Sequence, residues 1–311
     1  MTPDRAAPTA GASAGVPRHP KRLAYLGTPE AAVPPLRALV EAGFEVALVV
    51  SQPDRRRGRG GASTTSPVKA AALELGLPVT DRVADVTGVG ADLGVVVAYG
   101  RLIQPPVLAA LPMVNLHFSL LPRWRGAAPV ERALLAGDTE TGVCLMQLEE
   151  GLDTGPVFAC ETVPIGPDES AEELLAQLVA VGTSLLVSQL TAGLGEPDPQ
   201  TGEPTHAAKI DVADLVLRWE RPATELHRLV RLGRAWTTFR GKRFKVLRAD
   251  LVADPVDGPG APGTFADDGV TVATGDGALR LVEVQPEGKP AQPADAWRNG
   301  ARPGPADRLG A

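Results

Sequence analysis

The sequence predicts an α/β fold in which a mostly parallel sheet is followed by a small antiparallel barrel or sandwich. In the first part of the chain, short apolar runs alternate with segments whose apolar residues recur at helical spacing. This alternation is typical of βαβ units, and therefore of a parallel sheet covered by helices on both faces. Beyond residue 205, short alternating runs are separated by Gly, Asp and Pro turns, which is typical of a small antiparallel β domain.

The elements of the first part follow from apolar spacing and from the residues that end each run. Leu36, Leu39 and Val40 recur at helical spacing before Gly43, which indicates a helix after the first strand. The unbroken valine run before Tyr99 indicates a strand that is buried on both faces. The expected strands are 22–28, 45–51, 92–100 and 113–119, and helices are expected before Gly76 and over 170–190.

Composition limits the kind of protein. With 311 residues the chain is long enough for about two domains. An apolar fraction of 44% and a charged fraction of 22% are ordinary for a soluble protein, and no apolar run approaches the roughly 18 residues that a membrane span needs. The net charge of −6 argues against a general nucleic-acid binder, although a local basic patch is compatible with it.

Cysteine and histidine usage predicts a reducing, cytoplasmic setting and no structural metal. The sequence has two cysteines, Cys144 and Cys160, and two in a chain of this length do not make a disulfide framework. The histidines show no metal-ligand spacing. They are His19, His117, His206 and His227.

A linker over 192–205 is expected to separate the two domains, because this segment is rich in Gly, Pro and Glu and lacks apolar periodicity. The first 20 residues have no apolar core of the kind found in a secretory signal, so a disordered tail is expected there. The expected organisation is a tail over 1–20, a first domain over 21–191, the linker over 192–205, a second domain over 206–290 and a tail over 291–311.

Three polar residues of the first domain are candidates for chemistry. Asn115 and His117 lie two residues apart near the end of a predicted strand, so their side chains point to the same face, at an end where parallel sheets bind ligands. Asp153 lies in "GLDTG", and we expect its flanking glycines to permit a tight turn that presents the carboxylate inward. An Asp that orients a charged imidazole, with an amide donor beside it, suits attack on a carbonyl without a covalent enzyme intermediate.

Spacing alone leaves other interpretations open. A single histidine at a strand end is more often a structural residue than a catalyst, and "GLDTG" by itself is compatible with an ordinary turn. Ser119 lacks the G-x-S-x-G context of a hydrolase nucleophile. A nicotinamide dehydrogenase is disfavoured because the first strand runs into "LGTPEA" and not into G-x-G-x-x-G.

Longer motifs resemble one family along most of the chain. They include "RLAYLGTPEAAVPPLRAL", "VVVAYGRL", "NLHFSLLPRWRGAAPVERALLAGDTETGV", "GLDTGPV" and, in the second domain, "AAKID" and "VATGDGALRLVEVQPEGKP". In this order they resemble motifs of the methionyl-tRNA formyltransferases, a branch of the 10-formyltetrahydrofolate-dependent formyltransferases, over about residues 21–290. The resemblance implies a Rossmann-like catalytic domain followed by an OB-like β-barrel that binds tRNA.

The resemblance implies transfer of the formyl group of 10-formyltetrahydrofolate to the α-amino group of methionyl initiator tRNA, for translation initiation. It implies a cytoplasmic monomer with no metal and no membrane partner. Asn115, His117 and Asp153 match the family's catalytic residues, with Asn115 and His117 stabilising the oxyanion formed by direct attack of the amine. The "SLLP" loop matches the folate-binding segment, which consists of Ser119, Leu120, Leu121 and Pro122. The alternative activity is N-formylation of a sugar nucleotide or another small amine.

Two basic regions are candidates for tRNA binding. The stretch "QPDRRRGRG" is either a solvated flexible loop or, as the resemblance implies, a loop that orders against the acceptor stem. Its arginines are Arg55, Arg56, Arg57 and Arg59. Between Lys209 and Asp250 there are eleven Lys or Arg and five Asp or Glu, and arginines at every third position predict a basic stripe on one helix. The candidates here are Arg228, Arg231, Arg234, Lys242, Arg243 and Lys245.

Two departures from the family's pattern bear on these sites. Phe118 follows His117 where the family usually has Ala or Gly, so we expect a tighter site or a displaced loop beside the imidazole. After the arginine loop, the stretch "GGAS", beginning at Gly60, replaces a lysine-rich continuation, which removes positive charge near the expected acceptor stem.

Overall fold

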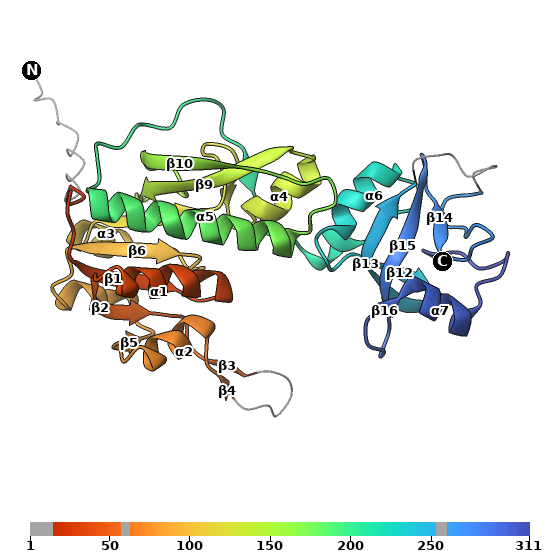
Figure 1. Ribbon diagram of the computed structural model, residues 1–311, viewed down its shortest axis with the longest axis horizontal. Helices are drawn as coiled ribbons and strands as arrows, with labels where there is room; N and C mark the ends of the chain where they lie inside the picture. Colours follow the sequence, from red (N-terminus) through yellow and green to blue (C-terminus); the bar gives the residue numbers. More distant parts are fainter. Residues whose placement is uncertain (1–14, 57–62, 253–259) are drawn as a thin grey trace, which may run out of the picture. The chain divides into compact units, whose positions relative to one another are not determined.

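The computed structural model describes residues 15–56, 63–252 and 260–311. These residues form two compact units (Figure 1). The first unit contains the described residues up to His117, with Val143–Glu161 and Val179–Gly202. The second contains Phe118–Gly142, Thr162–Leu178 and the described residues from Glu203 onward. Since this division by compactness runs through strands and a helix, the domain limits expected from the sequence stay a prediction.

A seven-stranded sheet forms most of the first unit, in the order β10-β9-β7-β6-β1-β2-β5 (Figure 1). Neighbours from β7 to β5 pair in parallel, whereas β7 pairs antiparallel with β9. This pattern confirms the predicted Rossmann-like, mostly parallel sheet. The strands are β1 (Arg22–Gly27), β2 (Glu45–Val50), β5 (Val79–Thr80), β6 (Leu93–Val97), β7 (Met113–His117), β9 (Glu140–Gln147) and β10 (Val157–Pro164).

Short helices between the strands close the core of this unit. Leu26, Val50 and Val96 of three neighbouring strands belong to one buried apolar cluster. At the start of α2 the Ser66 hydroxyl accepts a hydrogen bond from the Lys69 amide at 3.2 Å, which satisfies one of the unpaired donors of the first turn. The helices of this part are η1 (Glu30–Ala32), α1 (Val33–Glu41), α2 (Pro67–Glu74), η2 (Val83–Gly88) and α3 (Pro105–Ala110).

The helix α5 (Ala171–Ala192) is 22 residues long and reaches a mean hydropathy of 1.6. By length and composition it could cross a membrane, although polar residues such as Gln177, Thr183 and Ser184 interrupt its apolar residues, so it contains no unbroken apolar run of the length that a span needs. A side chain at Gly182 would come within 2.9 Å of both Leu116 and Val143. The missing side chain therefore lets α5 pack closely on β7 and β9, as a core helix does.

The two cysteines form a disulfide, contrary to the expectation from their number. Cys144 is buried in β9, and Cys160 lies in β10, the neighbouring edge strand. Their Cα atoms are 4.1 Å apart. The pairing depends on the register of two adjacent strands, which a separation of 16 residues in the sequence does not reveal.

A five-stranded antiparallel sheet forms the core of the second unit, in the order β12-β13-β15-β14 with β16 paired to β15. Trp297 packs against Phe239, Phe244 and Phe265, with ring centroids 4.7 to 5.9 Å apart. The predicted small, OB-like antiparallel β domain is confirmed. The second unit contains β12 (Trp236–Phe239), β13 (Lys242–Leu251), β14 (Thr271–Ala273), β15 (Ala278–Pro286), β16 (Gln292–Pro293), α4 (Pro129–Ala136), η3 (Val212–Leu215), α6 (Ala223–Val230) and α7 (Ala294–Ala301).

Residues 291–311 are not the tail that the sequence suggested. They contain β16 and α7, and both Trp297 and Leu309 are buried. Leu309 also forms a β-bridge with Phe239. The segment has too few apolar residues to show periodicity, but one large aromatic side chain is enough to anchor it in the core.

Parts of the expected linker also pair with regular elements. In the first unit, Val157 and Asp198 exchange two backbone hydrogen bonds of 2.8 Å. In the second unit, β11 (His206–Ala207), which directly follows the expected linker, pairs in parallel with β8 (Arg125–Gly126). The Gly and Pro content of the segment 192–205 correctly indicates that it forms no helix. It does not reveal the backbone pairings, which depend on segments far away in the sequence.

Candidate active site

β7 presents Asn115 and His117 on one face, because they are alternate residues of a single strand. Asn115 lies beside Val96 of β6 and Met146 of β9, and His117 lies beside Cys144 of β9. The two polar residues are 9% and 5% exposed. His117 is the last residue of β7, so the pair lies at the carboxyl end of an interior strand, as predicted.

Asp153 lies in the loop between β9 and β10, and its carboxylate faces the imidazole. Oδ2 of Asp153 is 3.8 Å from Nδ1 of His117. Asp153 is only 8% exposed, so little water screens the attraction between the carboxylate and a protonated imidazole. The structure therefore brings Asp153 close to His117, which lies 36 residues earlier in the sequence. His117 and Asn115 belong to the same strand, two positions apart.

The turn around Asp153 is tight, as its flanking glycines indicated. A side chain at Gly155 would overlap the carbonyl oxygen of Gln147, and one at Gly151 would overlap the side chain of Thr154. The left-handed backbone conformation falls on Asp153 itself, with a φ of 52°. Asp adopts this region more readily than most residues, because its short side chain can form local hydrogen bonds.

Gln200 holds this loop from a segment that the sequence assigned to a linker. Its Nε2 donates to the carbonyl oxygens of Asp153 and Gly155, at 2.9 and 2.8 Å. The amide thereby joins two backbone positions on either side of Thr154 and limits the directions in which the Asp153 carboxylate can project. Sequence reasoning missed Gln200, since no local pattern marks a residue 47 positions from its partner.

The arrangement suits stabilisation of a tetrahedral oxyanion. The Asn115 amide and an N–H group of the His117 imidazole can both donate hydrogen bonds, and the Asp153 carboxylate lies where it can orient the imidazole. The two cysteines form a disulfide with each other in this structure. The described residues thus favour direct transfer between two substrates over a covalent enzyme intermediate.

The expected folate loop, 119–122, has a defined backbone in the second unit. The bond between its last two residues is cis. The Ser119 hydroxyl is buried and donates to the Arg123 carbonyl at 2.6 Å, while the Pro122 carbonyl accepts from the Thr205 amide at 3.3 Å. These hydrogen bonds determine the shape of the loop, and its role in folate binding stays a prediction.

Phe118, the departure next to His117, is buried. The interior therefore accommodates the larger aromatic side chain. The expectation of a tighter site or a displaced loop stays a prediction.

The structure corrects the predicted arginine stripe. α6 ends at Val230, so Arg228 lies within the helix, Arg231 forms its C-terminal cap and Arg234 follows the turn at Gly233. The three-residue spacing of the arginines continues beyond the end of α6. The spacing alone therefore suggested a row of basic side chains longer than the helix can carry. The three side chains do not share one helical face.

Arg231 and Arg234 are engaged within the protein. The half-buried guanidinium of Arg231 donates to the carbonyl oxygens of Glu169 and Gly166 at 2.7 Å each. Burial lowers the pKa of Arg231 from its ordinary value. Arg234 pairs with Glu131 at 3.1 Å. The assignment of Arg231 and Arg234 to tRNA binding stays a prediction. Their guanidinium groups have fewer N–H donors available for phosphate than the sequence suggested, because some already bind groups of the protein.

The other basic candidates lie on strands. Lys242, Arg243 and Lys245 belong to β13, and the Arg243 guanidinium stacks 4.3 Å from the centre of the Trp236 ring. Arg55 and Arg56 form β3 (Arg55–Arg56), which pairs antiparallel with β4 (Ser63–Thr64). Arg57 and Arg59 lie outside the described residues.

Comparison with known families explains why these elements occur together. A family model described as formyl transferase matches residues 21–190, and a second, described as the formyl transferase C-terminal domain, matches residues 209–302. The chain belongs to the formyl transferase family. The family is one of enzymes, so this formyl transferase is an enzyme. The first match contains Asn115, His117 and Asp153, so the candidate catalytic residues lie in the family's N-terminal region.

Two named relatives are similar to this formyl transferase over nearly their whole length. A methionyl-tRNA formyltransferase of Symbiobacterium thermophilum is 46% identical over 302 residues, covering 90% of this chain and 92% of the relative. A methionyl-tRNA formyltransferase of Heliobacterium modesticaldum is 42% identical, covering 93% of this chain and all of the relative.

Solved structures share the fold of this formyl transferase at low identity. HypX from Aquifex aeolicus, in complex with tetrahydrofolic acid, superposes with a TM-score of 0.63 and 18% sequence identity. The superposition covers 90% of this chain and 47% of HypX. An N-formyltransferase from Helicobacter canadensis, with folinic acid and dTDP-3-aminofucose, gives a TM-score of 0.63 and 15% identity, covering 84% of this chain and 98% of that one.

Proposed function

We propose that the protein transfers the formyl group of 10-formyltetrahydrofolate to the α-amino group of methionyl initiator tRNA. The observation that carries this proposal is the 42–46% identity, over 90–93% of the chain, to relatives named methionyl-tRNA formyltransferase. The buried pair of His117 and Asp153 at the end of β7 is consistent with it. Formylation of a sugar nucleotide is the alternative, but the sugar N-formyltransferase neighbour is only 15% identical.

Three side chains carry the proposed chemistry. The donor supplies an electrophilic formyl carbon, to which the methionine amine forms a new C–N bond as the bond to N10 of tetrahydrofolate breaks. Asn115 donates its amide hydrogen to the formyl oxygen as negative charge develops, and protonated His117 donates a second hydrogen bond. Asp153 orients the imidazole and helps to move the proton off the attacking amine. One proton leaves the amine and one reaches N10, so the overall reaction balances.

The same residues fit a folate donor. An amide and an imidazole are buried at a strand end whose remaining positions are apolar, so two hydrogen-bond donors converge on one small region. We assign the backbone of loop 119–122 to the pterin, with the leucines of that loop as its apolar contacts. No metal takes part in this mechanism, since the carbonyl is polarised by two side-chain donors.

For the tRNA we assign two basic surfaces. The first is the arginine loop at Arg55 and Arg56. The second is made by Arg228 and by the exposed Lys242 and Arg243, with Lys245 beside them in β13. Guanidinium groups bind phosphates through two parallel hydrogen bonds, and the sum of such contacts makes RNA binding depend on salt.

We place the protein in the cytoplasm as a monomer with no membrane partner, where initiator tRNA is aminoacylated. Stable disulfides are uncommon in that compartment. A count of free thiols tests this placement. Thiols alkylated at the moment of cell lysis, without added reductant, should number two if the protein lies in the cytoplasm. A retained Cys144–Cys160 bond in that sample would count against the placement.

The proposed activity is tested with purified protein, 10-formyltetrahydrofolate and two acceptors, methionyl initiator tRNA and a dTDP-amino sugar. We expect formylmethionine on the tRNA and no product on the sugar. Uncharged initiator tRNA is the control, because it has the same phosphates and no amine. Formylation of the sugar alone would replace this proposal by its alternative.

A further inference from the structure

A polar cluster at the carboxyl end of the parallel sheet takes no part in the mechanism proposed above. It consists of Thr28, which follows β1, Gln52, which lies just beyond β2, and Tyr99, which lies just beyond β6. Gln52 and Tyr99 are 9% and 3% exposed. A buried carboxamide costs free energy unless it is hydrogen-bonded, so the burial of Gln52 requires specific partners. We call these three residues the strand-end cluster.

Three hydrogen bonds connect the strand-end cluster. Nε2 of Gln52 donates to the Tyr99 carbonyl oxygen at 2.7 Å. The Thr28 hydroxyl donates to the same carbonyl oxygen at 3.1 Å and accepts a hydrogen bond from the backbone amide of Gln52 at 3.4 Å. One backbone carbonyl thus receives two side-chain donors, and the ends of β1, β2 and β6 are joined through it.

The cluster holds a turn, residues 98–100, whose backbone is unusual. Ala98 has a φ of 47° and Gly100 a φ of 77°. The left-handed region is uncommon for a residue with a Cβ atom, so contacts with the surroundings are needed to keep Ala98 there. A side chain at Gly100 would come within 2.9 Å of Nε2 of Gln52, so glycine at this position lets the carboxamide approach the turn. Loss of the carboxamide would remove a contact that keeps the turn in this shape.

The turn begins beside the catalytic strand. β6 pairs in parallel with β7, and Val97 lies beside Leu116. The next residues along the two strands are Ala98 and His117, so the turn starts at the level of the imidazole. A displacement of the turn would therefore alter the space next to the proposed oxyanion donors. Misplacement of reacting groups by about 1 Å is enough to slow an oriented reaction.

The base of the arginine loop has hydrogen bonds and an ion pair of its own. The hydroxyl oxygens of Ser51 and Ser66 are 2.6 Å apart, and Nζ of Lys69 pairs with the Asp54 carboxylate at 2.9 Å. Ser51 and Asp54 flank Gln52 in the sequence. Removal of the Gln52 carboxamide therefore leaves the base of the loop attached to α2. A change at Gln52 should act on the transfer step and not on tRNA binding.

We propose that Gln52 is a positioning residue for formyl transfer, which acts by holding the turn 98–100 beside the catalytic pair. The inference rests on the proposed function, which supplies the reaction. Gln52 acts through the Tyr99 carbonyl and not through a contact with either substrate. Thr28 supports the same carbonyl, so the two side chains act on one backbone group.

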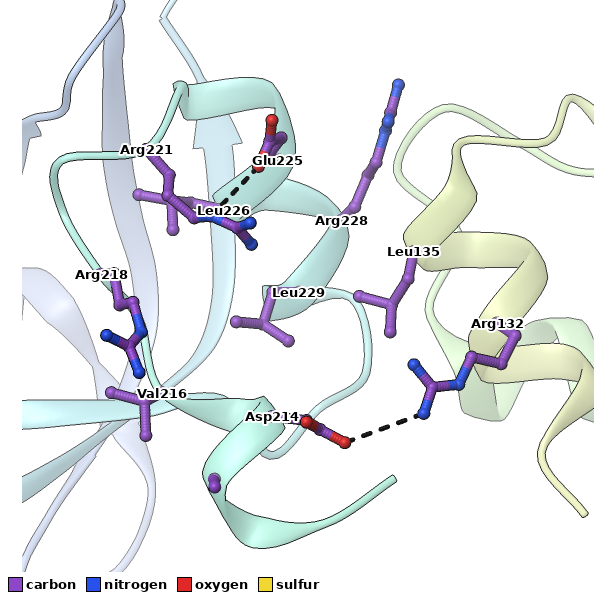
Figure 2. Close-up of a pocket in the computed structure, with 11 residues that line it drawn as sticks. Arg132, Leu135, Asp214, Val216, Arg218, Arg221, Glu225, Leu226, Arg228 and Leu229 are labelled. Atoms are coloured by element: carbon purple, nitrogen blue, oxygen red, sulfur yellow. Dashed lines mark ion pairs between the residues drawn. The ribbon is translucent and has the colours of Figure 1, made fainter. Parts of the chain in front are cut away.

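The test measures formylation of methionyl initiator tRNA by wild type, Gln52→Ala and Gln52→Glu. We expect Gln52→Ala to lower kcat about tenfold, with the KM for tRNA and the melting temperature retained. Gln52→Glu keeps the size of the side chain but replaces the N–H donor by an oxygen, so it should lose at least as much. Glu225→Gln is the control, because its pair with Arg221 is exposed to solvent (Figure 2), and it should keep the wild-type kcat.

Variants of Thr28 test whether the two side chains act on one carbonyl. Thr28→Val removes the hydroxyl and should lower kcat, whereas Thr28→Ser keeps the hydroxyl and should stay close to wild type. The double variant Thr28→Val/Gln52→Ala should lose less than the product of the two single losses, because residues that share a partner are not independent. A loss equal to the full product would overturn the shared action on Tyr99.

The remaining outcomes are equally distinct. A wild-type kcat in both Gln52 variants, with the melting temperature retained, would overturn the positioning role. A higher KM for tRNA at constant kcat would also overturn it, because it would indicate a substrate contact. If Gln52→Ala lowers the melting temperature, Thr28→Val and Thr28→Ser decide, and equal rates for these two would overturn the proposal. Failure of the wild type to formylate methionyl-tRNA would instead count against the proposed function.

Discussion

Nδ1 of His117 lies 3.8 Å from Oδ2 of Asp153, and both side chains are largely buried. The strand β7 places the imidazole, but the carboxylate is placed by a separate loop between β9 and β10. Close packing at Gly155 and the hydrogen bonds of Gln200 shape that loop. The alignment of the pair therefore depends on tertiary contacts as well as on the two residues themselves.

Asp153→Asn removes the negative charge and keeps the size of the side chain. We expect kcat to fall by about 100-fold with little change in KM for methionyl-tRNA, since the imidazole loses the carboxylate that orients it for the transition state. Steady-state formylation kinetics measure this. Asp198→Asn, at an exposed position that pairs through its backbone, should keep full activity. An equal loss in both variants would show that the effect is not specific to Asp153.

Gln200→Ala removes both hydrogen bonds to the Asp153 loop. We expect kcat to fall by about tenfold at constant KM, because Asp153 loses its fixed direction while no proposed substrate contact is lost. The dependence of kcat on pH should broaden or shift, which loss of stability alone does not produce. Gln189→Ala in α5 serves as the matched control. A wild-type kcat and pH profile for Gln200→Ala would remove its positioning role.

His227 makes the stability of the second unit depend on pH. Burial lowers the pKa of His227, while Asp168 at 3.4 Å partly opposes this effect. The unfolded chain, with a pKa of about 6.5, therefore takes up a proton before the folded chain does. The free energy of unfolding should fall as pH drops from about 7 to 5.5.

Melting temperatures measured across this pH range test the effect of His227. The His227→Gln variant has no titrating group at this position, so its melting temperature should change less with pH. Parallel curves for the variant and the wild type would assign the pH dependence to other groups.

Arg231→Ala should lower the stability of the fold, because the Arg231 side chain is held inside the protein. The substitution removes two charge-assisted hydrogen bonds and leaves the carbonyls of Gly166 and Glu169 without their donor. The expected loss is about 2–3 kcal/mol in the free energy of unfolding, measured by urea denaturation. Arg243→Ala, an exposed position on β13, should change stability by less than about 1 kcal/mol. The opposite order would mean that Arg231 is not structural.

Local patterns were sufficient for the sheet and for part of the site. Apolar runs alternating with helical spacing predict parallel strands, and the two-residue period of a strand places Asn115 and His117 on one face. These inferences succeeded because each depends on neighbouring residues. The end of α6 at Val230 shows the limit, because arginine spacing continued through a turn that ends the helix.

Contacts between distant segments could not be read from the chain. The hydrogen bonds from Gln200 to the Asp153 loop and the disulfide between Cys144 and Cys160 depend on loop packing and strand register. The charge of Arg231 is visible in the sequence and suggests a contact with tRNA, whereas its hydrogen bonds to the Glu169 and Gly166 carbonyls depend on tertiary packing.

The central claim is that Asn115 and His117 together stabilise the oxyanion formed on a formyl donor. Single-turnover formylation of methionyl initiator tRNA by wild type, Asn115→Ala and His117→Ala tests it most directly. We predict product with the wild type and a fall of about 100-fold or more in the rate for each variant, with tRNA binding retained. A His117→Ala variant that formylates at the wild-type rate would contradict the account.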